Sequence, residues 1–313
     1  MNKAPPARLD DLIARAKQLP KLTAAIAHPC DAASIEGAAE VAKLGFIEPV
    51  LVGPEAKVRA AAQAAKADIS GFRLVATPHS HASAAQAVAM VRSGEAEILV
   101  KGSLHTDELM SAVVDPECGL RTERRISHVF VIDLAAYPRL LLITDAAVNI
   151  APTLEEKRDI VQNAIDLAHA IGVERPKVAV LSAVETVTSK LRSTIEAAAL
   201  CKMADRGQIV GGELEGPLAF DNAVSLEAAR DKGIDGDVAG QADVLVVPDL
   251  EAGNMLAKQL TFLAGAESAG IVLGARAPIA LTSRADSVKA RVASYALAAL
   301  LVDQRRREKP VAG

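Results

Sequence analysis

The sequence predicts an α/β fold with mostly parallel sheets, because short apolar runs alternate along the chain with Ala-rich helical stretches. The runs are almost free of polar residues, which is typical of strands buried on both faces of a sheet. They are LTAAIA, EPVLVG, FRLVAT, EILVKG, KVAVLS, ADVLVVPD and APIALT. The chain has 313 residues, and single cores rarely grow beyond roughly 250–300 residues. Two lobes are therefore expected.

Apolar residues between these runs recur at helical spacing. They predict helices over Ser34–Leu44, Ser83–Val91 and Leu154–Ile171. Thr153 and Glu156 at the start of the third helix are typical of a capping box. A further helix is expected from 287 to 301, with an Asp286-Ser287 pair at its beginning.

One passage breaks the alternation. The stretch ISHVFVIDLAAYPRLLLIT, from Ile126 to Thr144, contains two strand-like runs joined by a few residues around Tyr137-Pro138. That connection is too short for a crossover helix, so the two runs are expected to form a hairpin. A lobe boundary is placed just before it.

Composition and charge exclude several function classes. A net charge of −4 and an aromatic content of 2% offer neither the charge nor the stacking surfaces that nucleic acid binding needs. Charges interrupt the N-terminal apolar runs, and no later run reaches about eighteen apolar residues, so neither a signal peptide nor a membrane segment is expected. Cys30, Cys118 and Cys201 form no C-x-x-C pair, which favours reduced thiols and a cytoplasmic protein.

Polar residues follow several of the predicted strands. In parallel α/β sheets, ligands collect beyond the carboxyl ends of the strands. Those positions hold Lys101-Gly102-Ser103, Thr144-Asp145, Ser182, Pro248-Asp249 and Ser283-Arg284. Helix capping would account for any one of them alone, but it does not call for Lys or Arg. A ligand site on one rim of the sheet is therefore expected.

The segment TSRADS, residues 282–287, joins the last predicted strand to the last predicted helix. The free N–H groups of the helix start attract anions, and Arg284 can bind two oxygens of a phosphate or carboxylate. Ser283 at the strand tip can donate a hydrogen bond to a carbonyl oxygen that becomes negative during acyl transfer. The alternative is structural: Ser283 or Asp286 caps the helix and Arg284 forms a surface ion pair.

A second polar segment is GGELEGPLAFDNAV, residues 211–224. Its glycines, proline and acidic residues predict a loop between helices that walls a substrate site, with a plain turn as the alternative. Motifs for dinucleotides, P-loop phosphates and α/β-hydrolase nucleophiles are absent. His79-x-His81 has no nearby acidic or thiol ligand, so no metal site is expected.

Three segments together resemble one enzyme family. VVPDLEAGNMLAKQLTFLAGAESAGIVLGARAPIALTSRADS resembles the C-terminal signature of phosphate acetyl- and butyryltransferases, with its P-D-x-x-x-G-N, A-G-A-E and S-R elements. ITDAAVNIAPTLEEK and EGPLAFDNAVS are similar to other segments of that family. The resemblance runs from about Val100 to Leu301. The residues of EGPLAFDNAVS and LTSRADS are more similar to the butyryl-type branch than to the acetyl-type branch.

The resemblance implies reversible transfer of a short acyl group between coenzyme A and inorganic phosphate. Coenzyme A would be a substrate, and no permanently bound cofactor or metal is implied. The implied fold has two α/β lobes like those of isocitrate and isopropylmalate dehydrogenases, with an interlobe cleft. One lobe would comprise 1–126 and 274–313, the other 127–273. The implied partners are acyl-CoA, phosphate and a second copy in a homodimer.

The family's catalytic Ser-Arg pair falls on Ser283 and Arg284. By the resemblance, the serine polarises the acyl carbonyl and its oxyanion, while the arginine holds the phosphate. Polar residues of the matching region are the implied substrate and coenzyme A contacts. They are Lys101, Asp145, Asn149, Asp221, Asn222, Asp249 and Asn254.

Two positions depart from the acetyl-specific pattern. Ala290 stands where such members have an Asp thought to deprotonate the coenzyme A thiol, and Phe262 stands where they have an Arg. Asp286 is the first candidate for the missing base, with Asp221 and Asp145 behind it. The alternatives are a non-catalytic acyl-CoA-sensing module and a decarboxylating dehydrogenase of the same fold.

Overall fold

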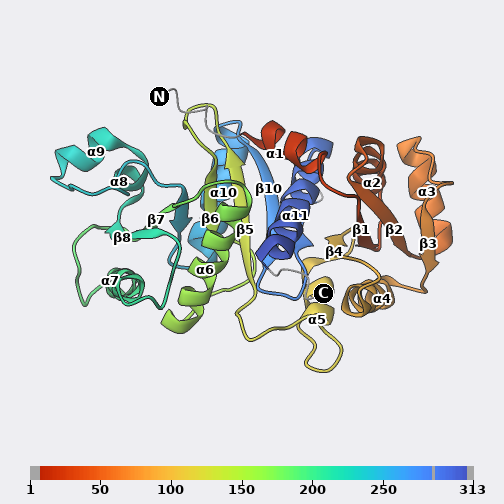
Figure 1. Cartoon of the computed structure of the whole chain (residues 1–313), viewed down its shortest axis with the longest axis horizontal. Coiled ribbons are helices and arrows are strands. Elements are labelled where there is room, and N and C mark those ends of the chain that lie inside the picture. Colours follow the sequence, from red (N-terminus) through yellow and green to blue (C-terminus); the bar gives the residue numbers. More distant parts are fainter. Residues whose placement is uncertain (1–7, 284–285, 309–313) are drawn as a thin grey trace. The chain divides into compact units, whose positions relative to one another are not determined.

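The computed structural model of the chain describes residues 8–283 and 286–308 (Figure 1). The chain divides into two compact units. Unit 1 comprises Met1–Arg8 and Arg125–Ser268, and unit 2 comprises Leu9–Arg124 and Ala269–Gly313. The functional lobes with bounds 1–126 plus 274–313 and 127–273 stay a prediction.

Unit 2 is built on a mostly parallel sheet, as the alternation of strands and helices predicts. Its strand order is β3 (Arg73–Ala76), β2 (Ile47–Gly53), β1 (Leu22–Ala27), β4 (Ile98–Lys101), β11 (Ile279–Ala280) and β10 (Glu267–Leu273). Neighbouring strands are parallel from β3 to β11. β10 is an unpredicted strand that runs antiparallel to β11.

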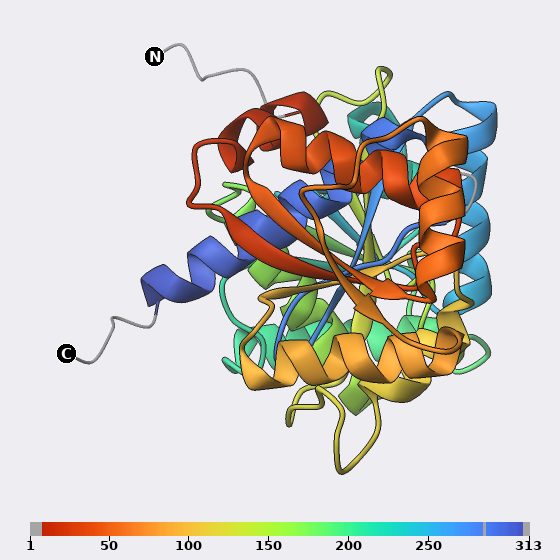
Figure 2. The same cartoon turned by 90° about the vertical axis from the view of Figure 1, so that its right-hand side faces the viewer.

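Helices cover both faces of this sheet. Figure 2 shows α2 (Ala32–Leu44) on one face and α4 (Ser80–Ser93) on the other. Both predicted helices are confirmed, and both begin at a capping side chain: Asp31 accepts the Ser34 N–H, and His79 accepts the Ala82 N–H. The remaining helices of the unit are α1 (Leu9–Ala16), α3 (Glu55–Ala65), α5 (Thr106–Val113) and α11 (Val288–Glu308).

The last helix, α11, is longer than predicted and runs through the basic C-terminal segment. Val292, Tyr295 and Ala299 of this helix are buried, while Val288 is half-buried. Arg305–Arg307 occupy its last turn, where positive charge is favourable next to the helix dipole.

Unit 1 has the strand order β5 (Ser127–Asp133), β6 (Leu141–Thr144), β9 (Val244–Val246), β7 (Lys177–Leu181) and β8 (Glu213–Leu218). β5 and β6 pair antiparallel, so the predicted hairpin is confirmed. The other neighbours are parallel. The helices of this unit are α6 (Leu154–Ala170), α7 (Arg192–Asp205), α8 (Phe220–Val224), α9 (Leu226–Asp231) and α10 (Leu250–Leu263).

The start of α6 confirms the predicted capping box. The Thr153 N–H donates to Glu156 Oε2 (2.9 Å), and the Glu156 N–H donates to Thr153 Oγ1 (3.3 Å). The apolar positions that predicted this helix are buried, among them Ile160, Ala164 and Leu167.

The prediction of a loop over 211–224 is wrong. Residues 213–218 form β8, and 220–224 form α8. β8 lies at the end of the strand order and pairs only with β7 among the described strands. Much of a strand with one neighbour is only half-buried, so such a strand tolerates polar residues. Glu213 and Glu215 are the residues that led to the prediction of a loop.

Gly102 lets two strand ends approach closely in unit 2. A Cβ at this position would lie 2.4 Å from the carbonyl oxygen of Ala27 and 2.7 Å from that of His28. The Gly102 N–H donates to the Ala27 carbonyl oxygen at 2.9 Å.

No helix within the described residues has both the length and the apolar character that crossing a bilayer requires.

We predict that Gly102→Ala destabilises the protein by about 1–3 kcal/mol, because rigid backbone atoms have to move to admit the methyl group. Urea unfolding monitored by circular dichroism measures the change. Gly71→Ala is the matched control, since nothing lies within 4 Å of its added Cβ. Equal unfolding midpoints for the two variants would contradict the close approach.

Candidate active site

In unit 2, the ends of β4 and β11 bring Lys101 next to Thr282. The two strands are parallel neighbours, so the residues that follow them lie at the same edge of the sheet. Lys101 Nζ donates to the Thr282 carbonyl oxygen at 3.3 Å, and Thr282 Oγ1 donates to the Lys101 carbonyl oxygen at 3.4 Å. Both residues are buried. The predicted rim thus carries the buried ammonium group of Lys101, which is bonded to the residue that precedes Ser283.

Ser283 presents an exposed side chain on a fixed backbone. Its N–H donates to Asp286 Oδ2 at 2.6 Å, and its carbonyl oxygen accepts the Asp286 N–H at 3.2 Å. Within the described residues, the fold therefore brings together Lys101, Ser283 and Asp286 of the predicted site. Arg284 lies outside the described residues.

Asp286 has an environment suited to proton transfer. It is half-buried, and burial raises the pKa of its carboxyl group above the usual range. The bond from the Ser283 N–H and the charges of Arg291 and Lys101 act in the opposite direction on that pKa. A carboxylate with a raised pKa is a stronger base than an ordinary surface aspartate.

Arg291 belongs to this cluster, although the sequence analysis missed it. Its Nη1 donates to Thr282 Oγ1 at 3.0 Å and its Nη2 to the Ser283 carbonyl oxygen at 2.8 Å. The only sequence signal is a cation on the otherwise apolar face of the last helix. The preceding residue, Ala290, is buried and offers no base.

In unit 1, Asp145 organises the loop that follows β6. Its Oδ1 accepts the N–H groups of Ala147 (2.9 Å) and Val148 (3.0 Å), and its Oδ2 accepts both the N–H (3.2 Å) and Nδ2 (2.5 Å) of Asn149. Asp145 and Asn149 are both buried. The two predicted residues therefore lie together, and their side chains shape the loop.

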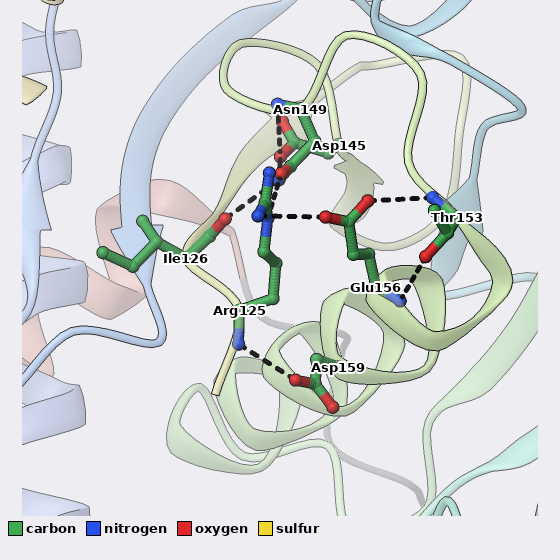
Figure 3. Close-up of polar contacts among 7 residues, drawn as sticks. All are labelled: Arg125, Ile126, Asp145, Asn149, Thr153, Glu156 and Asp159. Carbon is green, nitrogen blue, oxygen red and sulfur yellow. Dashed lines mark hydrogen bonds and ion pairs between the residues drawn. The ribbon is translucent and has the colours of Figure 1, made fainter. Parts of the chain in front are cut away.

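Arg125 closes this network from the other side (Figure 3). Its Nε donates to Asn149 Oδ1 at 2.6 Å, and its Nη1 pairs with Glu156 Oε1 at 2.9 Å. Asn149 Nδ2 also donates to the Ile126 carbonyl oxygen at 2.9 Å. The capping box of α6 is thereby tied to the Asp145 loop, a link that the sequence did not indicate.

The P-D-x-x-x-G-N element docks α10 on the same loop. Asp249 caps the helix by accepting the Ala252 N–H at 2.9 Å, and Asn254 Nδ2 donates to the Ala146 carbonyl oxygen at 3.0 Å. A Cβ on Gly253 would lie 2.8 Å from the Asp145 carbonyl oxygen. The glycine thus permits the close approach that the Asn254 side chain holds.

Asp221 and Asn222 lie in a different cluster of unit 1. Asp221 is exposed and pairs with Lys232 at 3.4 Å, while buried Asn222 donates to Glu185 Oε2 at 3.4 Å. Lys232 also pairs with Glu185 at 3.5 Å. Their described contacts lead to each other and not to Asp145.

A pocket of about 580 Å³ opens where β7 and β9 end, between α8 and α10. Its wall is mainly apolar, with Ser182 and Gln259 as polar members. The apolar lining includes Leu181, Phe220, Val247, Leu256 and Leu260. This pocket is large enough to take an apolar portion of a ligand.

His128 lies in β5 and is fully buried. Within the described residues neither ring nitrogen has a hydrogen-bond partner, and its ring meets that of Phe130 edge-on at 4.4 Å. Burial lowers the pKa of this imidazole to about 4, against the opposing charge of Asp145. His128 is therefore neutral at pH 7.

We predict that His128 makes stability fall as the pH drops from 6.5 to 4. In that pH window the imidazole binds a proton in the unfolded chain but not in the folded protein. The free energy of unfolding therefore decreases by about 3 kcal/mol over the full range. Urea unfolding at several pH values measures this slope. His128→Leu should lose it, and an identical slope in the variant would assign the proton elsewhere.

Comparison with known proteins places these features in a family. The family model described as "Phosphate acetyl/butaryl transferase" matches residues 79–299. A phosphate acetyltransferase of Rhizobium meliloti is 62% identical over 303 residues, covering 97% of this chain and 96% of that protein. A phosphate butyryltransferase of Clostridium acetobutylicum is 41% identical over 291 residues, covering 93% and 96%.

A solved structure agrees with these matches. The branched-chain phosphotransacylase of Enterococcus faecalis V583 is 31% identical, with a TM-score of 0.79 over 90% of this chain and 99% of that one. The likeness thus extends over nearly the whole length of the chain, beyond the segments that hold the S-R, G-N and A-G-A-E elements. The chain belongs to the phosphate acetyl/butyryl transferase family of acyltransferases.

Proposed function

We propose that the protein transfers a short acyl group between coenzyme A and inorganic phosphate, with Ser283 at the reacting carbonyl. The observation that carries this site is the exposed Ser283 side chain on a backbone held by Asp286 and Arg291. Membership of the acyltransferase family supports the reaction.

In the forward direction a phosphate oxygen forms a bond to the thioester carbon, and the carbon–sulfur bond breaks. The thiolate that leaves takes up a proton to give coenzyme A, and the phosphate becomes an acyl phosphate. Ser283 donates a hydrogen bond to the oxygen that becomes negative. Phosphate is already a capable nucleophile, so positioning removes much of the barrier.

Positive charge beside Ser283 suits both anions of this reaction. Arg284 is the proposed phosphate ligand, since a guanidinium can bind two phosphate oxygens at once. Lys101 adds a buried positive charge at the neighbouring strand end, although its described bonds go to the carbonyl oxygens of Gly102 and Thr282. We propose that the positive charge of Lys101 stabilises the site electrostatically.

Asp286 is the proposed proton acceptor for the coenzyme A thiol in the reverse direction. Its raised pKa and its bond to the Ser283 N–H support the proposal of a base next to the serine. A thiol with a reference pKa of about 8.5 needs only modest help to ionise. This arrangement accounts for an active site in which position 290 holds Ala.

The proposed coenzyme A contacts of unit 1 fall into two kinds. Asp145 and Asn149 are buried and saturated by internal bonds, so they act by shaping the loop. Asp221 is exposed, and Asp249 and Asn254 are half-buried, so these three keep surface for a ligand.

We propose acetyl as the preferred acyl group. The relative with 62% identity is named as an acetyltransferase, although the wording of LTSRADS looks closer to the butyryl-type branch. One methylene is worth only about 1–3 kcal/mol of discrimination, so propionyl and butyryl groups should react more slowly and not be excluded.

We predict that thiol release from acetyl-CoA requires phosphate and that Ser283→Ala lowers kcat by about 10²–10³-fold, because the oxyanion loses a donor. Acyl-CoA affinity should stay nearly unchanged, and Arg284→Ala should mainly raise KM for phosphate. Coupling the released thiol to a chromogenic disulfide measures the rate with acetyl-, propionyl- and butyryl-CoA.

Ser93→Ala is the matched control, since its hydroxyl donates to the Met90 carbonyl oxygen within α4. Wild-type rates in both site variants would refute the assignment of Ser283 and Arg284. Binding of acyl-CoA without phosphate-dependent release would favour the sensing module instead.

We also propose that the protein works as a homodimer in the cytoplasm. Its three cysteines are free thiols, which suits a reducing compartment. Met255 and Phe262, two turns apart on α10, are 57% and 71% exposed, and Leu263 at the end of the helix is 85% exposed. Clustered exposed apolar residues are typical of a protein interface.

We predict a mass in solution of about twice the chain mass of 32.5 kDa, and a shift to the monomer in Phe262→Glu. The new charge would have to be buried without a partner in the dimer. Light scattering coupled to size exclusion measures the mass. Val114→Glu is the control, because Val114 is an exposed apolar residue at the end of α5. A wild-type monomer would refute the proposal.

A further inference from the structure

Arg291 carries a buried positive charge beside the proposed catalytic serine. It lies in the first turn of α11 and is only 3% exposed. Its two described hydrogen bonds go to neutral oxygens, the Thr282 hydroxyl and the Ser283 carbonyl. Its Nε is buried and has no hydrogen-bond partner among the described residues. No carboxylate of the described residues forms an ion pair with this guanidinium.

Such a charge is unfavourable for folding. A cation taken out of water is stabilised mainly by an ion pair or a full set of hydrogen bonds. Among the described residues Arg291 has two hydrogen bonds and only the more distant opposite charge of Asp286. An apolar side chain of similar volume would suit the same position at least as well. Fold stability therefore does not explain why a guanidinium group occupies this position. Its two hydrogen bonds offer the explanation.

Those bonds reach two consecutive residues of the segment between β11 and α11. The planar guanidinium binds Thr282 through its hydroxyl and Ser283 through its carbonyl oxygen, so it fixes the orientation of both residues. Asp286 holds the N–H of the same serine. The backbone of Ser283 is thus held on both its donor and its acceptor side.

A second helix makes room for this side chain. Gly37 lies inside α2, and a Cβ there would be 3.2 Å from Arg291 Cδ and 3.3 Å from Arg291 Cβ. Glycine is a poor residue for a helix interior compared with alanine. Its presence here lets the Arg291 stem pass between α2 and α11.

We propose that Arg291 is a positioning residue that holds Ser283 in the orientation needed for acyl transfer. The proposal rests on the function proposed above and assigns Arg291 no contact with substrate. The residue acts through the Ser283 carbonyl oxygen and the Thr282 hydroxyl.

The test compares Arg291→Met, Arg291→Lys and Arg291→Ala with the wild type in the thiol-release assay. A small misplacement of a catalytic group can lower turnover by about 10²-fold, and we expect that loss of kcat in Arg291→Met with KM values nearly unchanged. Arg291→Lys, which keeps the charge but not the planar fork, should be intermediate. Added guanidinium ion should partly restore Arg291→Ala.

Thermal unfolding of the same samples separates positioning from folding. The melting temperature of Arg291→Met should equal or exceed that of the wild type, because a buried charge has been removed. Lys289→Met is the matched control on the same helix, since Lys289 is partly exposed and pairs with Asp10 at 2.9 Å; it should keep full turnover. Gly37→Ala, which crowds Arg291 without removing it, should lower kcat less than Arg291→Met does.

Each outcome decides the proposal. Full turnover in Arg291→Met, a raised KM at unchanged kcat, or an activity loss that merely follows a loss of folded protein would overturn it while leaving the proposed function intact. A wild type without phosphate-dependent thiol release would overturn the proposed function itself, and the positioning role with it.

Discussion

The candidate site depends on the parallel pairing of β4 with β11. Ile279 pairs with Leu99 and Ala280 with Val100, so two segments far apart in the sequence end at the same edge of the sheet. β11 contributes only two residues to this ladder, and beyond it side chain-to-backbone bonds join Lys101 and Thr282 in both directions. Any change of register would move Ser283 away from the buried ammonium, because side chains alternate between faces along a strand.

Around this pairing, buried charges act on backbone groups more than on each other. Lys101 and Arg291 both donate to carbonyl oxygens of the segment that holds Ser283, and Asp286 accepts the N–H of that serine. Charges in such a poorly hydrated place have strong effects, and they need no reorganisation when a substrate becomes negative. The consequence is a fixed backbone that carries an exposed hydroxyl. The same burial raises the pKa of Asp286, the carboxylate proposed as the base where position 290 holds Ala.

Unit 1 shows how the polar residues of a motif can bind the backbone. Asp145 satisfies three N–H groups of its own loop, and Asn254 holds a carbonyl oxygen of that loop from α10. Gly253 is needed because the helix passes so close to the Asp145 carbonyl oxygen. The G-N element therefore holds α10 against this loop. The parts of unit 1 that keep exposed surface are Asp221, Asp249 and Asn254, together with the apolar pocket at the ends of β7 and β9.

The sequence by itself determined the strand and helix alternation, the Ile126–Thr144 hairpin, the Thr153 capping box and the place of Ser283 between a strand and a helix, because each depends on neighbours along the chain. It failed for β8, since an edge strand has one partner and tolerates a polar composition. Only the tertiary structure decided the roles of Arg291, Gly37 and Gly102. Their partners lie far away in the sequence, and a single Arg or Gly in a helix or loop has no local pattern that reveals what packs against it.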